Sequence, residues 1–245
     1  MELEKKWQRT FADRATRFET PHEISHWTPK GFETRRNRIA REIKKLHRPG
    51  ERVLDLGSGP GHYGGLFEHP VLVDYAREVF SRTPSALSLH RVCADFGALP
   101  FRSGSFDGLL CVGVLQCRRL TQEDLAGAAR VLKPGGWFLF ETLNCESTFL
   151  HYDLRGAQFE RLARFIGRKE EGPCYFLLDE YVIYQAGKLI PWFERAGLKV
   201  RGLQYLCFPD PVSLVQELVA HRACPAPVPK NFAKSFYLFG VKSRV

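Results

Sequence analysis

A run of apolar residues that turns on three glycines is the part of this chain best suited to chemistry. Val53–Leu56 predicts a short buried strand, and Gly57, Gly59 and Gly61 follow it at intervals of two residues. Glycine has no Cβ and tolerates positive φ, so the backbone here can turn sharply and approach a ligand. Amides of such a turn can hold a polar group, helped by the N-terminus of a following helix. The segment therefore predicts a site for a nucleotide-like cofactor.

The glycines alone leave the kind of cofactor open. Gly59, Gly61 and Gly64 match the spacing of a dinucleotide-binding fingerprint, and Asp74 lies about where that fingerprint has its acid. A tight turn between a strand and a helix, with no ligand, is the other interpretation of the same residues. The residues further along the chain decide between these interpretations.

Strands and helices alternate after the glycine turn. Further strands are expected within 71–74, 87–94, 106–112, 137–140, 198–205 and 235–241. Thr121 and Asp124 have the spacing of a capping box, and Pro134 ends the helix that they open. A short helix is expected over 76–82, and another over 188–196 with Pro191 in its first turn. This alternation predicts a parallel sheet with helices on both faces and a ligand at the carboxyl ends of its strands.

Length and composition suit one α/β domain with additions, or two small domains, in a chain of 245 residues. No stretch of 18 apolar residues occurs, and the charged N-terminus lacks an apolar signal core, so we expect no membrane span. The seven cysteines are scattered and form no C-x-x-C pair. They favour a reducing cytoplasm and argue against a disulfide framework or a structural metal site.

The chain carries a formal charge of +9, and seven of its basic residues lie between Arg35 and Arg48. Ile39, Ile43 and Leu46 recur at helical spacing in the same stretch, which predicts an amphipathic helix with the charges on its solvated face. Attraction to nucleic acid, anionic lipid or an acidic substrate is the alternative interpretation.

Five motifs in order resemble those of class I S-adenosylmethionine-dependent methyltransferases, in the small-molecule branch called methyltransferase type 11. They are Val53–Gly61, Val73–Asp74, Ala94–Phe101, Ser105–Gly108 and Val131–Gly136. The resemblance covers residues 50 to 145, with weaker similarity in 193–198 and 239–242. The dinucleotide-binding interpretation, which would make the protein a nicotinamide-dependent oxidoreductase, therefore becomes the alternative.

This resemblance implies an α/β fold with a Rossmann-like doubly wound sheet, mostly parallel with an antiparallel C-terminal strand. A helical N-terminal lid is expected over residues 1–49. The methyltransferase domain is expected over 50–245, with a substrate-covering insertion at about 145–187 after the fifth strand.

The implied cofactor is S-adenosylmethionine, with S-adenosylhomocysteine as the product. Members of the family bind the methionine end with the glycine turn, which here consists of Gly57, Ser58, Gly59 and Gly61. Asp55 would orient that end, directly or through water.

Residues that follow the next strands would bind the rest of the cofactor. Asp74 matches the acid that accepts two hydrogen bonds from the ribose, and an ionised carboxylate suits this because it only accepts. Tyr75 would pack on the adenine face, Asp95 would accept the adenine amino group, and Phe96 would supply a backbone amide. The segment that starts at Val112 would run past the sulfonium. As alternatives, Asp74 could cap a helix and Asp95 could be a turn acid.

The chain departs from the family pattern in two places. Asp74 comes only 17 positions after Gly57, so the first helix should be short. Gln116 and Cys117 stand where the family often has Glu-His, which leaves no inherited general base. Many members hold the nucleophile in line with the methyl group instead. The candidates for a base come from the segments that cover the substrate, where packing is the competing role: His22, His26, His151, Tyr152 and Tyr184.

Aromatic residues in the N-terminal segment and in the insertion suggest an apolar or aromatic small-molecule acceptor, and the basic surface suggests an acidic group on it. The sequence leaves O-, N-, S- and C-methylation open. An RNA methyltransferase is an alternative because of the positive charge, although no Asn-Pro-Pro-Tyr-type sequence and no RNA-binding module is present. A non-catalytic S-adenosylmethionine-binding scaffold is another alternative.

Overall fold

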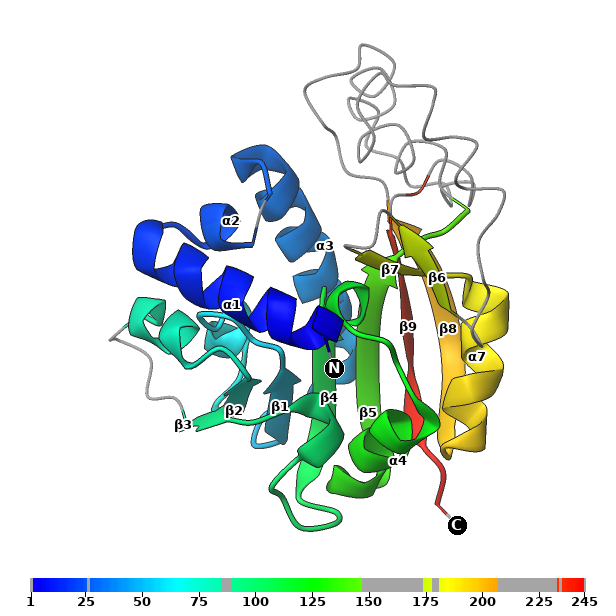
Figure 1. The fold of residues 1–245 in the computed structure, drawn as a ribbon. Coiled ribbons are helices and arrows are strands. Elements are labelled where there is room, and N and C mark those ends of the chain that lie inside the picture. Colours follow the sequence, from blue (N-terminus) through cyan, green and yellow to red (C-terminus); the bar gives the residue numbers. More distant parts are fainter. Residues whose placement is uncertain are drawn as a thin grey trace.

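A seven-stranded sheet forms the centre of the molecule, with the order β3-β2-β1-β4-β5-β9-β8 (Figure 1). The computed structural model describes residues 2–25, 27–84, 90–146, 174–177, 181–206, 233 and 235–244. The strands are Arg52–Leu56 (β1), His69–Asp74 (β2), His90–Cys93 (β3), Phe106–Val112 (β4), Leu132–Leu143 (β5), Leu198–Leu206 (β8) and Ser235–Lys242 (β9). β1 to β5 pair in parallel, whereas β9 is antiparallel to both β5 and β8. This confirms the predicted fold class.

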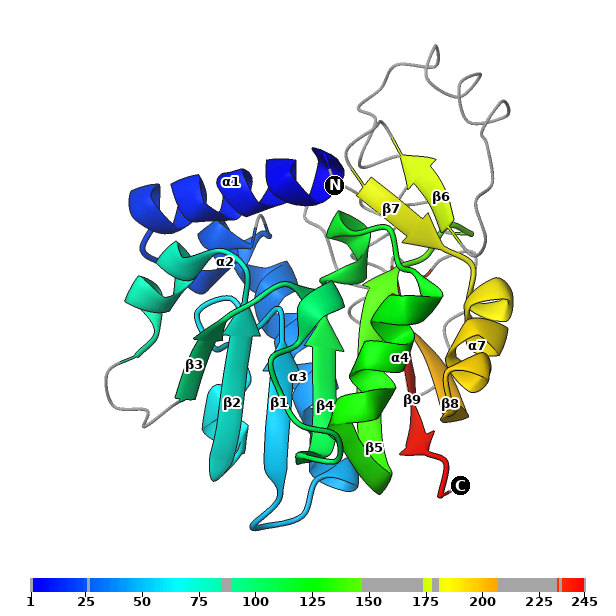
Figure 2. The same cartoon turned by 60° about the horizontal axis from the view of Figure 1, so that its bottom comes forward.

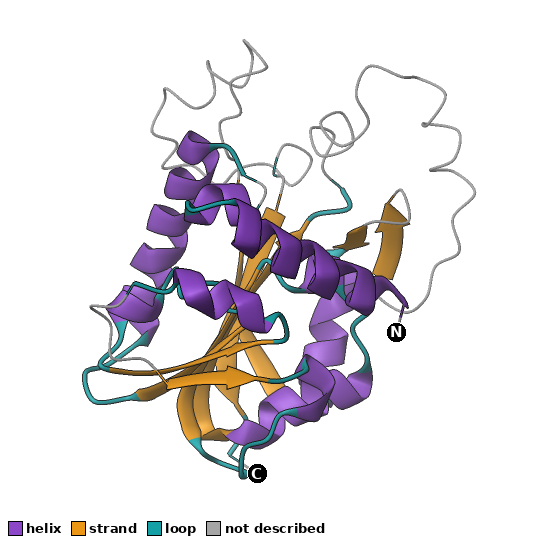
Figure 3. Ribbon diagram, turned by 60° about the vertical axis from the view of Figure 1, so that its left-hand side comes forward, coloured by secondary structure: helices purple, strands orange, loops and turns teal. Residues whose placement is uncertain are grey.

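Helices cover both faces of the sheet (Figure 3). The helices are Glu2–Arg17 (α1), Pro21–Ile24 (α2), Pro29–Leu46 (α3), Gln122–Val131 (α4) and Ala186–Arg195 (α7). Short 3₁₀ turns lie at Gly64–Leu66 (η1), Arg77–Arg82 (η2), Phe96–Ala98 (η3) and Leu115–Cys117 (η4). No helix among the described residues is long and apolar enough to cross a membrane.

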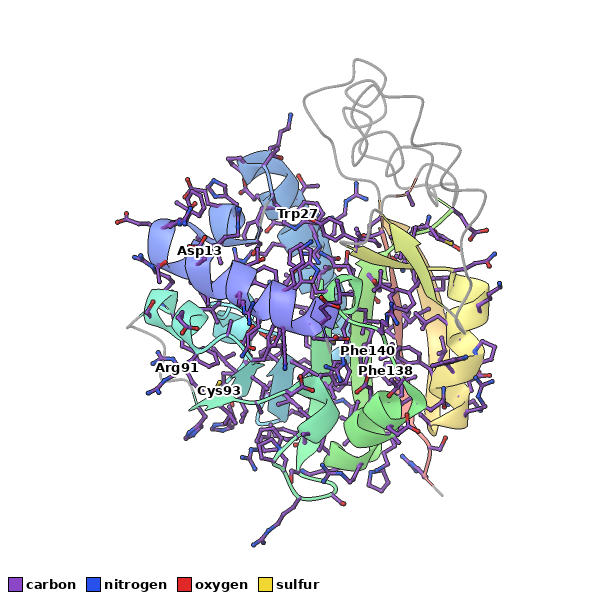
Figure 4. The ribbon with its side chains drawn as sticks, viewed as in Figure 1. Asp13, Trp27, Arg91, Cys93, Phe138 and Phe140 are labelled. Carbon is purple, nitrogen blue, oxygen red and sulfur yellow. The ribbon has the colours of Figure 1, made fainter. Side chains whose placement is uncertain are left out.

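The two faces of the sheet have separate apolar cores. On one face, Ile39 and Ile43 of α3 pack with Val53 and Leu139. On the other face, Phe193 of α7 lies 5.7 Å from Phe138 and 4.9 Å from Phe140 between ring centroids. Figure 4 labels this pair of phenylalanines on β5. Alternating side chains of one strand thus reach opposite cores, as the period of two in a strand requires.

Helix α1 lies across the carboxyl ends of the first parallel strands (Figure 2). Ala15 packs on Ala76 and Val79 of the segment after β2. Arg82 Nε donates to the carbonyl of Ala15 at 2.8 Å, and Gln8 Nε2 donates to the carbonyl of Tyr75 at 2.7 Å. The N-terminal helix is therefore fastened to the edge of the sheet at which a ligand is expected.

Local sequence signals account for the elements with one exception. The capping box is present, since Asp124 N donates to Thr121 Oγ1 at 3.1 Å and Thr121 N donates to Asp124 Oδ2 at 3.0 Å. Between β1 and β2 only the turn η1 forms, which agrees with the expected short helix. The position predicted for Pro191 is wrong: α7 begins at Ala186, so the proline lies inside the helix. The missing amide hydrogen there removes one helical bond, and burial of Leu189 and Phe193 compensates.

A two-stranded hairpin follows β5, formed by Cys174–Leu177 (β6) and Tyr181–Tyr184 (β7). It belongs to the expected insertion, of which the structure describes these strands and the segments next to them. Tyr181 contacts Trp7 of α1, with ring centroids 4.9 Å apart. His26, His151 and Tyr152 lie outside the described residues.

Candidate active site

One cavity lies at the carboxyl ends of the strands, and it brings the predicted cofactor residues together. Its walls come from the glycine turn, the ends of β2 and β3, the segment after β4, and the N-terminal helices. All of the predicted cofactor residues line it except Gly61. The amide of Gly61 instead donates to the carbonyl of Ser58 at 3.0 Å, so this glycine holds the turn closed.

The glycine turn has the backbone conformation that its sequence predicts. The φ angles of Gly57, Gly59 and Gly61 are 70°, 54° and 88°. The amides of Gly57 and Ser58 both donate to the carbonyl of Val73, at 2.7 and 3.0 Å. A Cβ on Gly57 would collide with Cγ2 of Val114, so the turn and the segment after β4 are in direct contact. Only glycine satisfies both the angle and the close approach at this position.

Asp55 is a buried acid with an unpaired oxygen beside this turn. Its side chain is 2% exposed, and Oδ2 has no hydrogen-bond partner among the described residues. Burial, followed by the charge of Asp74, raises the pKa of Asp55 to about 7. A buried acceptor without a donor costs free energy unless a ligand supplies one. A cationic amine at this position would pair the oxygen and favour the ionised form of the acid.

Asp74 already accepts hydrogen bonds from the backbone at the end of β2. Oδ2 accepts from the amide of Gly59 at 2.9 Å, and Oδ1 accepts from the amide of Ala76 at 3.0 Å. Burial raises the pKa of Asp74 to about 6, although these amides act in the opposite direction. The bond to Ala76 holds the turn after β2, whereas the N-cap of η2 is Ala76 and receives no side-chain cap, so the capping role considered from the sequence is wrong. Each oxygen keeps a further lone pair, so a diol in the cavity could still donate to this carboxylate.

Asp95 is tied down by an arginine that the sequence did not indicate. Its Oδ1 accepts from the amide of Gly97 at 2.7 Å and from Arg118 Nη1 at 3.0 Å. Arg118 also reaches Asp124 with two bonds, at 3.0 Å from Nε and 2.7 Å from Nη2. Burial alone would lower the pKa of Arg118, but the hydrogen bonds and charges of Asp124 and Asp95 raise it above its ordinary value. Arg118 therefore stays charged in the cavity wall.

Aromatic residues complete this end of the cavity. Phe96 is buried, and the guanidinium of Arg118 lies 5.4 Å from its ring centroid. Tyr75 also lines the cavity, and burial raises the pKa of its hydroxyl far above the ordinary value, so the hydroxyl remains protonated. Glu4 of α1 lines the same region, and its Oε1 accepts from the amide of Arg119 at 3.3 Å.

One residue of the cavity wall, Arg35, belongs to a buried ion pair. Arg35 of α3 forms two hydrogen bonds with Glu141 of β5, one of them from Nε to Oε1 at 3.2 Å. The two side chains are 7% and 1% exposed. Arg35 also lies 4.9 Å from the ring of Trp27. The assignment of Arg35 to a solvated helix face is therefore wrong, because a carboxylate 106 residues away compensates for its burial.

His62 is a further cavity residue that the sequence analysis did not select. Its Nε2 lies 3.0 Å from Ser25 Oγ, and Phe32 packs edge-on to its ring at 4.9 Å. Burial, with the charges of Arg35 and Arg36, lowers the pKa of His62 to about 3, so the ring is neutral. Gln116 also lines the cavity, and its buried Oε1 has no hydrogen-bond partner in the described part of the chain. The only signals in the sequence for a place in the cavity are that His62 follows the glycine turn and that Gln116 follows β4.

The two described candidates for a general base lie away from the cavity lining. The hydroxyl of Tyr184 is buried; it donates to the carbonyl of Arg118 at 2.8 Å and accepts from the amide of Leu120 at 3.3 Å. His22 lies in α2, with Nε2 3.4 Å from Thr20 Oγ1. Neither is among the described residues that form the cavity wall.

Known proteins resemble both the sequence and the fold. Malonyl-[acyl-carrier protein] O-methyltransferase of Erwinia billingiae is 37% identical over 111 residues, which are 41% of this chain and 42% of that protein. The chain spans less than half the length of the first curated relatives that it matches.

Two solved structures show the shared fold. A methyltransferase of Thermotoga maritima, described as a possible histamine N-methyltransferase, superposes with a TM-score of 0.64 at 16% identity, over 96% of this chain and 99% of that one. The 1,6-didemethyltoxoflavin-N1-methyltransferase of Burkholderia thailandensis, solved with its acceptor and S-adenosylhomocysteine, gives 0.56 at 18% identity, over 89% and 80%.

The family described as "Methyltransferase domain", type 11, matches residues 54–140, which include the end of β1, all of β2 to β4, most of β5 and the glycine turn. Residues 54–140 therefore match a methyltransferase domain of this family, and the chain shares the Rossmann-like fold of the S-adenosylmethionine-dependent methyltransferase from Thermotoga maritima.

Proposed function

We propose that this protein transfers a methyl group from S-adenosylmethionine to a small-molecule acceptor. The observation that carries the proposal is the cavity into which three neighbouring strands bring carboxyl groups: Asp55 near the end of β1, Asp74 at the end of β2 and Asp95 just after β3. Their order suits the amine, the diol and the nucleobase of the cofactor. The named relatives act on malonyl-[acyl-carrier protein] and on 1,6-didemethyltoxoflavin, which supports an acceptor other than RNA.

The methionine end would lie at the glycine turn. Asp55 would accept from the ammonium group, and the backbone of Gly57, Ser58 and Gly59 would surround the rest of this end. The close contact between Gly57 and Val114 holds the turn against the segment after β4, which keeps its backbone in the cavity wall.

The nucleoside would lie along the ends of β2 and β3. Asp74 would accept from the ribose hydroxyls with the lone pairs that Gly59 and Ala76 leave available. Tyr75 would cover the adenine, Asp95 would accept from its amino group, and the amide of Phe96 would donate to a ring nitrogen.

When bound, the cofactor supplies a methyl group on a positively charged sulfur. The segment from Val112 to Gln116 would hold the acceptor in line with this group, and orientation of this kind can supply much of the rate acceleration. We assign no general base. The hydroxyl of Tyr184 is occupied by two backbone groups, so we infer a structural role for it.

The acceptor would be apolar or aromatic, since Phe11, Trp27 and Phe32 line the cavity. An acidic group on the acceptor gains no support from the described part of the cavity. Both arginines that line it there, Arg35 and Arg118, are already paired with carboxylates. We therefore limit the proposal to the apolar or aromatic class.

Methyl transfer from labelled S-adenosylmethionine to a fractionated extract of the source cells tests this function, with Asp74→Ala as the control. Label in an organic-soluble or small polar fraction, absent with the variant, would support a small-molecule enzyme. Label that ribonuclease removes would favour the RNA methyltransferase. Tight binding of S-adenosylhomocysteine with no label in any fraction would favour the scaffold, whereas binding of NAD in its place would favour an oxidoreductase.

A further inference from the structure

Arg118 joins three parts of the fold at one end of the cavity. It follows the turn η4, lines the cavity, and is 16% exposed. Its Nη1 lies 3.0 Å from Oδ1 and 3.2 Å from Oδ2 of Asp95. Its Nε and Nη2 bind the two oxygens of Asp124, and its guanidinium lies 5.4 Å from the ring centroid of Phe96.

The anchor of this arginine is rigid. Asp124 is 3% exposed and belongs to the capping box at the start of α4. A planar guanidinium held by two parallel bonds to a carboxylate has little freedom to turn. The remaining nitrogen, Nη1, therefore points at Asp95 from a fixed position.

Asp95 depends on Arg118 for a fixed orientation because its own side chain is partly exposed to solvent. Its side chain is 47% exposed, and the amide of Gly97 binds only Oδ1. A solvated carboxylate with one backbone contact can rotate and lose the alignment of its other oxygen. The bond from Arg118 Nη1 to both oxygens fixes the plane of the carboxylate.

We propose that Arg118 is a positioning residue for nucleobase selectivity: it holds Asp95 so that the carboxylate accepts a hydrogen bond from the 6-amino group of adenine. The proposal rests on the proposed function, which places adenine at Asp95. Arg118 acts through Asp95 and through the wall formed by Phe96. It makes the site prefer adenine over a base with an oxygen at the same position, because that oxygen would face a carboxylate.

The test compares binding of S-adenosylhomocysteine with binding of S-inosylhomocysteine, in which an oxygen replaces the 6-amino group. Calorimetric titration of the full chain gives the ratio of the two dissociation constants. We expect the wild-type protein to prefer the adenine compound by at least about tenfold, the value of one hydrogen bond to a charged group. Asp95→Asn should bring the ratio close to one.

Arg118→Lys keeps the charge but not the planar fork, and it should lower the ratio by at least about threefold. Arg118→Met combined with Asp124→Asn removes the arginine without leaving a buried charge, and the side-chain oxygen of the introduced asparagine can still accept from the amide of Thr121. This double variant keeps the test informative if Arg118→Lys folds poorly. Arg119→Lys is the matched control, for which the ratio should stay at the wild-type value.

A merely structural arginine would weaken both compounds equally and leave the ratio unchanged. An unchanged ratio in the Arg118 variants, together with loss of the ratio in Asp95→Asn, would overturn the proposal while the cofactor site stands. If Asp95→Asn leaves the ratio unchanged, or if wild-type protein fails to bind S-adenosylhomocysteine, the assignment of Asp95 falls and takes this proposal with it.

Discussion

The two ends of the cavity differ in whether their charged groups have partners. At the end that contains Asp95, an acid and an arginine form a partly exposed network with Asp124, and each charge has a partner of opposite sign. At the end that contains Asp55, a carboxyl is buried with one oxygen unpaired among the described residues, close to the second buried carboxyl of Asp74. The first end is complete without a ligand, whereas the second end is not.

This difference assigns separate tasks to the two ends. Side chains that are already held by partners lose little conformational entropy when a ligand binds. Such a network can therefore select a ligand by shape and hydrogen bonding. A buried acid without a partner stores an unfavourable interaction that a cationic ligand relieves. We therefore expect selectivity to depend on the adenine end, and the pH dependence of affinity to depend on the methionine end.

The largest effect on stability and on affinity is expected from Gly57→Ala, which changes the glycine turn at the methionine end. The left-handed φ and the collision with Val114 should together cost about 2–5 kcal/mol of unfolding free energy. The displaced turn should also abolish detectable binding of S-adenosylhomocysteine. Denaturant unfolding and calorimetry measure the two effects.

Gly104→Ala is the matched control for that variant. Gly104 also has a positive φ, of 65°, but no described atom lies within 4 Å of the place that a Cβ would take. It should lose only the backbone term, about 1–2 kcal/mol, and keep full affinity. Equal loss of affinity in the two variants would show that general destabilisation, rather than the turn, controls binding.

Asp74→Ala lies between the two ends and should have the next largest effect. Removing two hydrogen bonds to a charged group, each about 1.5 kcal/mol, predicts a loss of S-adenosylhomocysteine affinity of about a hundredfold. Asp13→Ala, which removes an exposed acid of α1, should leave the affinity unchanged. An Asp74 variant that binds as tightly as wild type would remove the ribose assignment.

Asp55→Asn should change how affinity depends on pH. In the ligand-free protein the pKa of Asp55 is about 7, so below this pH the carboxyl holds a proton that must leave before it can pair with an ammonium group. Affinity for S-adenosylhomocysteine should therefore fall by up to about tenfold for each pH unit below 7 and level off above it. Below about pH 7, binding should release a proton to the buffer.

In the Asp55→Asn variant the slope near pH 7 should disappear. Only the contribution of Asp74 should remain, below its pKa of about 6. Calorimetry in two buffers of different ionisation enthalpy counts the protons released. Identical pH profiles for wild type and variant would contradict the contrast between the two ends.

The smallest effect is expected from Gln8→Ala at the adenine end. Its side chain donates to the carbonyl of Tyr75 at 2.7 Å and fastens α1 to the cavity wall. Loss of one neutral hydrogen bond at an exposed position predicts a two- to threefold weaker affinity, from about 0.5 kcal/mol. A much larger loss would mean that α1 contributes directly to the ligand.

Local signals in the sequence were enough for most of the fold and for the backbone of the site. Periodicity located the strands, Thr121 and Asp124 located a helix start, and the glycine spacing located the turn. Pro191 was misplaced because its cost in a helix is local, whereas the compensation by Phe193 comes from the distant core.

The charged partners of the site could not be found in this way. Arg35 and Glu141 are 106 residues apart, and Arg118 meets Asp95 across 23 residues, so neither pair has a spacing that predicts contact. Their meeting depends on the strand order, in which β4 and β5 follow β1 in the sheet although β2 and β3 follow it in the chain. Spacing along the chain therefore does not show that these residues meet.

The buried hydroxyl of Tyr184 has a consequence for how such a protein can diversify. It ties the last strand of the hairpin after β5 to the backbone on either side of Arg119. An exchange of residues within β6 that keeps this tyrosine should therefore leave the backbone around Arg119 in place. Replacement of Tyr184 itself should instead displace this backbone, and with it Arg118, whose side chain holds Asp95.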